Sequence, residues 1–186
     1  ASATYERQFP NTLRITITER KVTAVVALSS GPVAWYLGEN NVWLEADQLN
    51  VPEGKTTATV ALEKATSEGE LLITDVPATV SPVAGTTATD AEIQAVMQYQ
   101  STFSSELTSQ IVSYSASSVD AISVTLTNGV QVALGSPTQI ADKEKVILAM
   151  LKQFPGELTY LNVRTPSSPT YRRVSTGNVQ SGSGVS

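Results

Sequence analysis

The side chains that most often carry out enzymatic chemistry are scarce in this sequence, and their spacing matches no catalytic motif. The chain has no histidine, the commonest general base, and no cysteine for a thiolate nucleophile or a cysteine-based zinc site. It contains no Ser-x-x-Lys or Gly-x-Ser-x-Gly motif, no Walker sequence and no phosphate-binding glycine loop before a helix. We therefore expect no catalytic residues, no cofactor and no metal site.

Carboxylates come close together along the chain at two places. Glu45 and Asp47 are two residues apart, and so are Glu68 and Glu70. Hydrolysis of a glycosidic bond requires two carboxyl groups that converge across a cleft, and sequence proximity does not show convergence. We interpret these acids as solvated charges, and residues 142–145 (DKEK) as the solvated face of a helix. The prediction is that the protein is not an enzyme.

Three arginines near the end of the chain could instead take part in binding. The stretch LTYLNVRTPSSPTYRRV alternates like a strand, turns between Pro166 and Pro169, and resumes as a short extended run. A strand at a sheet edge presents unpaired N–H and C=O groups to which another chain can add a strand. Arg164, Arg172 and Arg173 could pair with carboxylates of such a partner, or could protect the edge against aggregation. The residues alone leave both interpretations open.

The composition indicates a folded protein with few surface charges. Of 186 residues, 41% are hydrophobic and 16% are charged, and the net charge is −5. This length can bury a core as one domain or two small ones. The negative charge argues against general electrostatic binding to nucleic acid or anionic lipid. Since no apolar stretch is long enough to cross a bilayer and no signal peptide begins at Ala1, we expect either a soluble protein or a piece cut away from a membrane anchor.

The first part of the chain is predicted to form strands. Residues 12–18 alternate, with Leu13, Ile15 and Ile17 on one face, which predicts a half-buried strand, and VTAVVAL predicts a more buried one. PVAWYLGENNVWLEA predicts a hairpin that turns at residues 38–41, where Gly and Asn tolerate positive φ.

The hairpin aromatics and the region that follows carry further expectations. We interpret Trp35, Tyr36 and Trp43 as core or cross-strand aromatics, and an exposed group of these rings would instead suggest glycan binding. Residues 50–69 show no clear pattern. LLITDVP predicts a short strand, and its Pro/Gly/Thr-rich continuation predicts a loop or joint.

The second part is predicted to contain two helices and several strands. After a cap at Thr89 or Asp90, apolar residues recur at helical spacing as far as Ile111, and a second helix is expected over residues 138–154. IVSYSAS and a hairpin at Asn128-Gly129 lie between the helices, and two strands close the chain. This order predicts an α+β fold, with a mostly antiparallel β-sheet and two helices packed on one face.

Several of these phrases, taken in order, resemble one family. ERQFPNTLRITITERKVTAVVAL resembles the segment of the FtsQ/DivIB bacterial cell-division family in which Arg-x-x-Pro precedes a strand ending in Glu-Arg-Lys. VTLTNGVQVALGS, IADKEKVILAMLKQF and LTYLNVRTPSSPTYR are similar to the close of the family's β domain. Two positions depart from the family pattern. Thr23 stands where Pro is common. Asn162 stands where the family usually has Asp, so no role that needs that carboxylate is carried over to this chain.

The resemblance implies a domain organisation. Residues 1–28 would be the last strand of a truncated POTRA domain and a lead-in strand, so that the chain begins inside that domain. Residues 29–174 would be the β domain, with a loop or joint at about residues 74–89. The composition of residues 175–186 predicts a disordered tail.

The resemblance also implies a function and a binding site. Family members are non-enzymatic, single-pass scaffolds whose extracytoplasmic part binds FtsB/DivIC- and FtsL-type partners at the septum, and they help control septal peptidoglycan synthesis. The partner's C-terminal segment adds to the β domain near its last strands. Carried over to this chain, the partner-binding residues are Arg164, Thr170, Tyr171, Arg172 and Arg173.

Other residues in the matching phrases are not expected to touch the partner. We interpret Tyr160 as a core residue and Lys143 as one member of a local salt bridge. The alternative function, from another class, is a POTRA-like or adhesin-type envelope module that binds polypeptide or glycan without a division role.

Overall fold

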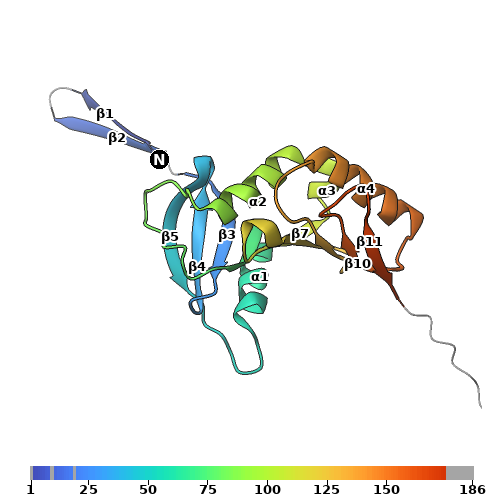
Figure 1. The fold of residues 1–186 in the computed structure, drawn as a ribbon. Coiled ribbons are helices and arrows are strands. Elements are labelled where there is room, and N and C mark those ends of the chain that lie inside the picture. Colours follow the sequence, from blue (N-terminus) through green and yellow to red (C-terminus); the bar gives the residue numbers. More distant parts are fainter. Residues whose placement is uncertain (1, 9–10, 19, 175–186) are drawn as a thin grey trace, which may run out of the picture.

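The structure, a computed structural model, describes residues 2–8, 11–18 and 20–174. Its main feature is a nine-stranded sheet (Figure 1). The strands of this sheet are β3 (Val22–Leu28), β4 (Val33–Gly38), β5 (Val42–Gln48), β6 (Leu71–Val76), β7 (Ile111–Ala116), β8 (Ile122–Leu126), β9 (Gln131–Ala133), β10 (Leu158–Asn162) and β11 (Thr170–Arg173). Their spatial order is β11-β10-β9-β8-β7-β6-β3-β4-β5.

The sheet is mixed but mostly antiparallel. Five neighbouring pairs are antiparallel, and the pairs β3–β6, β6–β7 and β9–β10 are parallel. Parallel neighbours need a crossover connection, which helices supply here. The helices are α1 (Thr57–Glu68), α2 (Ala91–Thr102), α3 (Ser105–Thr108) and α4 (Ile140–Gln153). The predicted α+β class with a mostly antiparallel sheet is confirmed.

The helices cover the two faces of the sheet unequally. α2 and α4 lie on one face, as predicted, and α1 lies on the opposite face (Figure 1). The larger core lies under α2 and α4 and includes Trp43, Tyr99 and Tyr114. A smaller core lies under α1, where Ala61 and Ala65 pack against β3 and its neighbours. The predicted hairpin of β4 and β5 is present, and Asn40 and Asn41 adopt positive φ in its turn.

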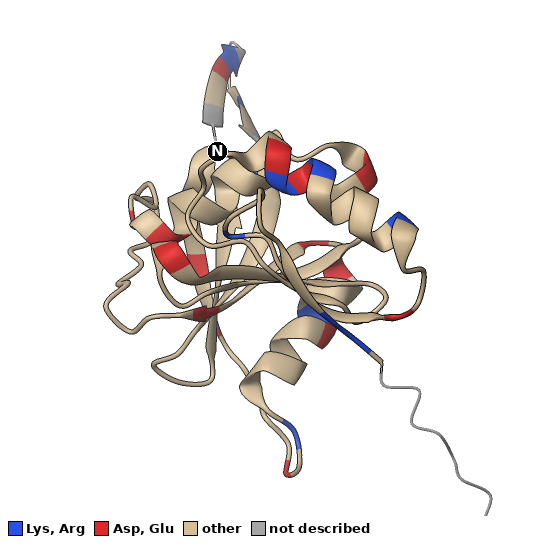
Figure 2. Ribbon diagram, turned by 45° about the vertical axis from the view of Figure 1, so that its right-hand side comes forward, with Lys and Arg blue, Asp and Glu red and all other residues tan. Residues whose placement is uncertain are grey.

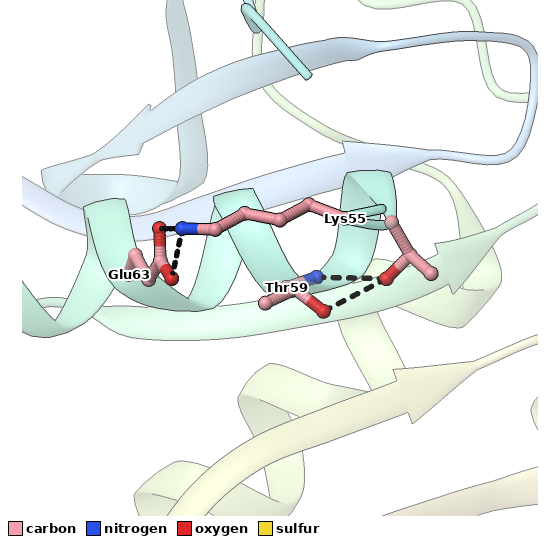
Figure 3. Close-up of polar contacts among 4 residues, drawn as sticks. Lys55, Thr59 and Glu63 are labelled. Atoms are coloured by element: carbon pink, nitrogen blue, oxygen red, sulfur yellow. Dashed lines mark hydrogen bonds and ion pairs between the residues drawn. The ribbon is translucent and has the colours of Figure 1, made fainter. Parts of the chain in front are cut away.

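Helix α1 occupies the stretch for which the sequence showed no pattern. It buries only the small side chains of Ala61 and Ala65, so its apolar face is narrow and its periodicity is weak. Polar contacts define its start instead, because the Thr56 hydroxyl accepts a hydrogen bond from the Thr59 N–H (3.2 Å) and Lys55 pairs with Glu63 at 2.6 Å (Figure 3). Gly69 ends the helix in the left-handed conformation.

The first of the two predicted helices, α2, is shorter than expected. α2 ends at Thr102, Phe103 adopts extended backbone angles, and Ile111 begins β7 rather than continuing the helix. The break is stabilised from α4, because the Glu144 carboxylate accepts a hydrogen bond from the Ser104 N–H (2.9 Å). Phe103 and Leu107 remain buried on either side of the break, so the apolar spacing continues through it without a continuous helix.

The N-terminal strands form a separate two-stranded sheet. β1 (Ser2–Gln8) pairs with β2 (Thr12–Thr18), and this hairpin projects from the rest of the molecule (Figure 1). The prediction of a half-buried strand is wrong for the side chains: Leu13, Ile15 and Ile17 are 58–68% exposed. They share one face with Tyr5, which lies opposite Ile15, but two paired strands alone cannot bury that face.

Two further expectations concern the membrane and the tail. No helix in the described part of the chain is long and apolar enough to cross a membrane. The predicted tail, residues 175–186, lies outside the described residues.

Candidate functional site

The predicted binding strand, β11, lies at one end of the nine-stranded sheet. It pairs antiparallel with β10, with Thr170 opposite Asn162 and Arg172 opposite Tyr160. Residues 170–173 are all exposed, and among the described strands none pairs with the outer side of β11. The backbone groups on that side are therefore available to an added strand.

The opposite end of the sheet is partly covered. At the start of β5, the Trp43 N–H donates to the Thr86 carbonyl (2.9 Å), and the Gly85 N–H donates to the Trp43 carbonyl (2.7 Å). Val42 also forms a bridge with Thr87. The loop before α2 thus occupies the first part of the β5 edge, whereas the β11 edge has no such cover from the described residues.

The side chains of β11 rest on aromatic rings on both faces of the sheet. On the helix-covered face, Tyr171 stacks on Phe154 with ring centroids 5.1 Å apart, and the Arg173 guanidinium lies 5.0 Å from the Phe154 ring. On the other face, the Arg172 guanidinium lies 4.7 Å from the Tyr160 ring. Both arginines stay exposed while packing over a ring, so less of their freedom remains to be lost on binding.

Charge adds to this arrangement. Arg173 forms an exposed ion pair with Glu157 at 3.4 Å, and the end of the last strand is basic (Figure 2). An exposed pair of this kind contributes little to stability, so Arg173 can exchange Glu157 for a carboxylate of a partner at small cost.

Arg164 lies beyond the end of β10, where the chain turns back towards β11. Its N–H donates to the Asn162 side-chain oxygen at 3.1 Å. An amide oxygen and a carboxylate oxygen can both accept this bond, so the Asn at this position still supports the turn. Arg164 is exposed, but its stem packs so closely on Gly135 that a Cβ atom there would lie 2.9 Å from Arg164 Cγ.

Four of the five predicted residues, those at positions 170–173, form the edge strand β11, whereas Arg164 follows β10 and its stem rests on Gly135 beside the end of β9. Because β10 and β11 are antiparallel, Arg164 lies near the start of β11, and Arg172 and Arg173 lie towards its end. The arrangement is a linear, cationic strand edge and not a cleft, and it suits an extended acidic segment.

Lys143 contradicts its prediction. It is not part of a solvated helix face or a local salt bridge: its side chain is 1% exposed, and its ammonium group donates to Tyr99 Oη at 2.9 Å and to the Ser136 carbonyl at 2.6 Å. Burial lowers the pKa of Lys143. Its neighbour Asp142 pairs with the exposed Lys145. The sequence contains the signal, since Lys143 follows Ile140 by three positions and precedes Ile147 by four, on the apolar face.

The hairpin aromatics occupy core or cross-strand positions, as predicted, with Trp43 buried and Trp35 and Tyr36 half-buried. Trp43 is 2% exposed, and Trp35 packs against it edge to face with ring centroids 6.1 Å apart. Tyr36 is half-buried and donates its hydroxyl hydrogen bond to Glu68. These rings do not form an exposed shelf for a sugar.

Two of the carboxylates noted in the sequence, Asp47 and Glu68, lie close together because both pair with Lys64. Lys64 Nζ lies 2.7 Å from Asp47 and 3.3 Å from Glu68, and the hydrogen bond to Asp47 is the main reason that its pKa is raised. Glu45 and Glu70 line a shallow hollow beside them. The described residues contain no cluster of acids suited to a metal ion.

Comparison with known proteins agrees with this fold. The family described as "Cell division protein FtsQ/DivIB, C-terminal" matches residues 58–164, more than half of the chain. The match runs from α1 to Arg164, so β11 lies just beyond it. No curated protein matches the chain. The family match, together with the large mostly antiparallel sheet, shows that this chain belongs to the FtsQ/DivIB family of cell division proteins.

Proposed function

We propose that this chain is the extracytoplasmic part of a non-enzymatic scaffold of the bacterial divisome, and that it binds FtsB/DivIC- and FtsL-type partners by strand addition at the outer edge of β11. In the whole protein, a single N-terminal transmembrane helix anchors this part at the division septum. Through its partners the scaffold helps control septal peptidoglycan synthesis. The family match supports the role in division.

The observation that carries the binding mode is the exposed outer edge of β11. A strand added there continues the alternation of the sheet. Its side chains meet Arg172 on one face, and Tyr171 and Arg173 on the face that also carries α4. The partner segment that would fit this edge is an extended strand. It carries carboxylates on both faces and an apolar side chain that packs on the Tyr171–Phe154 stack.

The arginines also favour a partner over a second copy of this chain. Two β11 edges brought together would place Arg172 and Arg173 of one copy close to those of the other, and like charges opposite each other destabilise strand pairing. An acidic partner removes that repulsion. The same residues thus act as gatekeepers against self-association and as binding groups.

We expect Arg164 to pair with a carboxylate of the bound segment. If the pair is desolvated on binding, truncation of either side chain should cost about 2–5 kcal/mol of binding free energy. A double-mutant cycle between Arg164→Ala and alanine substitutions of each acid in the partner measures the coupling. Energies that simply add for every acid would refute the pairing.

The function itself is tested by titrating the purified chain with the C-terminal segment of the FtsB/DivIC-type protein from the same organism. Wild type should bind saturably, Arg164→Ala should bind measurably more weakly, and a truncation before Thr170 should lose binding. Arg172→Glu with Arg173→Glu leaves the strand in place and should lose binding too, whereas Lys55→Glu, far from β11, should not. A folded wild type that does not bind would contradict the proposal.

The envelope-module alternative lacks its expected support. Glycan binding by this domain would have used the hairpin aromatics as an exposed platform, and Trp43 is buried while Trp35 and Tyr36 are half-buried.

A further inference from the structure

We infer that the buried Lys143, together with Tyr99, is a positioning device for Arg164. The inference rests on the proposed function of Arg164 in partner binding. It concerns residues that lie behind the sheet edge and that a strand added to β11 would not touch.

A single backbone carbonyl is the centre of this device. The Ser136 oxygen accepts hydrogen bonds from Lys143 Nζ (2.6 Å), from Tyr99 Oη (2.7 Å) and from the Thr138 N–H (2.8 Å). Lys143 Nζ also donates to Tyr99 Oη. Tyr99 comes from α2 and Lys143 from α4, so the two helices hold the β9–α4 connection between them.

Burying the ammonium group costs free energy, so packing alone does not explain why a lysine stands at this position. Among the described residues Lys143 is the one buried charged side chain, and its hydrogen-bond acceptors are a hydroxyl and a carbonyl rather than a carboxylate. A buried charge is expensive without a counter-ion, whereas an apolar residue at this position would pack without that cost. Unlike an apolar residue, the lysine donates a hydrogen bond that holds the Ser136 carbonyl in place.

The connection held in this way is the surface on which Arg164 lies. Gly135, immediately before Ser136, has a φ of +70° and lies directly under the Arg164 stem. The backbone of Arg164 is held separately, since the Val163 N–H donates to the Ala133 carbonyl and the Arg164 N–H donates to Asn162. With the backbone anchored on β9 and the stem supported by Gly135, the direction of the guanidinium depends on where the connection sits.

Removal of the ammonium should therefore weaken partner binding through Arg164. Lys143→Met keeps the unbranched stem and removes the ammonium group, so the Ser136 carbonyl keeps only its Tyr99 and Thr138 donors and the surface under Arg164 should become more mobile. The probe is the same FtsB/DivIC-type segment. We expect Lys143→Met to lower its affinity about tenfold in the wild-type background and less than twofold in an Arg164→Ala background.

The matched control is Lys145→Met, which removes an exposed lysine from the same helix and should leave affinity unchanged. Tyr99→Phe removes one donor to the Ser136 carbonyl while keeping the ring, so it should act in the same direction with a smaller effect. It also keeps the inference testable if Lys143→Met does not fold. An equal loss in the presence and absence of Arg164 would overturn the inference, because the lysine would then act on the fold in general.

A measurement without the partner separates this inference from the proposed function. The order parameter of the Arg164 Nε–Hε group, measured by NMR in the unbound protein, should fall in Lys143→Met and not in Lys145→Met. An unchanged order parameter would overturn the positioning role. If wild type did not bind the segment while the order parameter still fell, the proposed function would fail and the positioning of Arg164 would stand.

Discussion

At the scale of single residues, Gly135 has two reasons to be a glycine, its positive φ and its close contact with the Arg164 side chain. Its positive φ disfavours any residue with a Cβ atom, and its Cα faces Arg164. Gly129 has a similar φ of +82°, but an added Cβ there would meet no atom within 4 Å. The two glycines therefore separate the cost of backbone strain from the cost of crowding.

The glycine pair leads to a prediction for alanine substitutions. Gly129→Ala should lower the free energy of unfolding by about 1–2 kcal/mol through strain alone. Gly135→Ala should cost more, because Arg164 must also move, and it alone should weaken partner binding. Chemical denaturation and the peptide titration measure the two effects. Equal stability losses in the two variants would show that the Arg164 contact is unimportant.

Lys143 leads to a prediction about pH. Burial lowers its pKa in the folded state, so between this lowered value and the ordinary value the unfolded chain binds more protons than the folded one. Unfolding then becomes harder as pH rises through that window. In the folded chain Tyr99, the titratable group in contact, stays protonated across this window because burial raises its pKa.

The expected result is a stability difference that depends on pH. The free energy of unfolding of wild type relative to Lys143→Met should increase from neutral pH towards pH values near the ordinary lysine pKa. Denaturation of both proteins across this range measures the difference, in which the other titrating groups largely cancel. A difference that is constant with pH would mean that Lys143 titrates alike in the folded and unfolded chains.

At the scale of elements, α1 combines a narrow apolar face with a polar cap at its start. The Thr56 hydroxyl satisfies the Thr59 N–H, and Thr56 itself is exposed. Thr56→Ala should therefore lower the free energy of unfolding by about 1 kcal/mol. Thr56→Ser keeps the hydroxyl and should cost much less. Urea denaturation compares the variants, and equal losses would argue against the cap.

The break between α2 and α3 is the second feature of the elements that differs from the prediction. Apolar residues at helical spacing run through it, which is why a single helix was expected. Where the backbone leaves the helix, Glu144 of α4 supplies an acceptor for the Ser104 N–H. A contact 40 residues away in sequence thus helps to stabilise a local boundary.

At the scale of the whole molecule, the N-terminal hairpin and the nine-stranded sheet are separate sheets. The assignment of residues 1–28 to the end of a POTRA domain with a lead-in strand, and of residues 29–174 to a β domain, stays a prediction. The hairpin has an exposed apolar face, which includes Tyr5 at 81% exposure. β3, which follows the hairpin, belongs to the large sheet.

The separation predicts that the sheet folds without the hairpin. Deletion of residues 1–20 should change the free energy of unfolding of the remaining chain by no more than about 0.5 kcal/mol. In the undeleted chain, the β1 and β2 amides should exchange rapidly unless the hairpin pairs with another copy. A large destabilisation on deletion, or slow exchange in a monomer, would show that the hairpin is held by the rest of the fold.

The sequence alone was sufficient to predict most strands, the helix α4, and the hairpin turns at residues 38–41 and at Asn128-Gly129. Alternation, helical spacing and turn residues are local signals. The sequence also indicated the closing arginines, and the family resemblance is the source of the binding role proposed for them. Helix α1 escaped prediction because it buries only alanines, and Lys143 was misplaced because residue type outweighed its position on the apolar face.

Only the tertiary structure decided which residues became neighbours. It placed β11 at the edge of the sheet, left Leu13, Ile15 and Ile17 exposed, and brought Tyr99, Ser136 and Lys143 together behind Arg164. The physical reason is that periodicity determines which side of an element is apolar, whereas the order of strands and the partner of each side chain depend on contacts between residues distant in sequence.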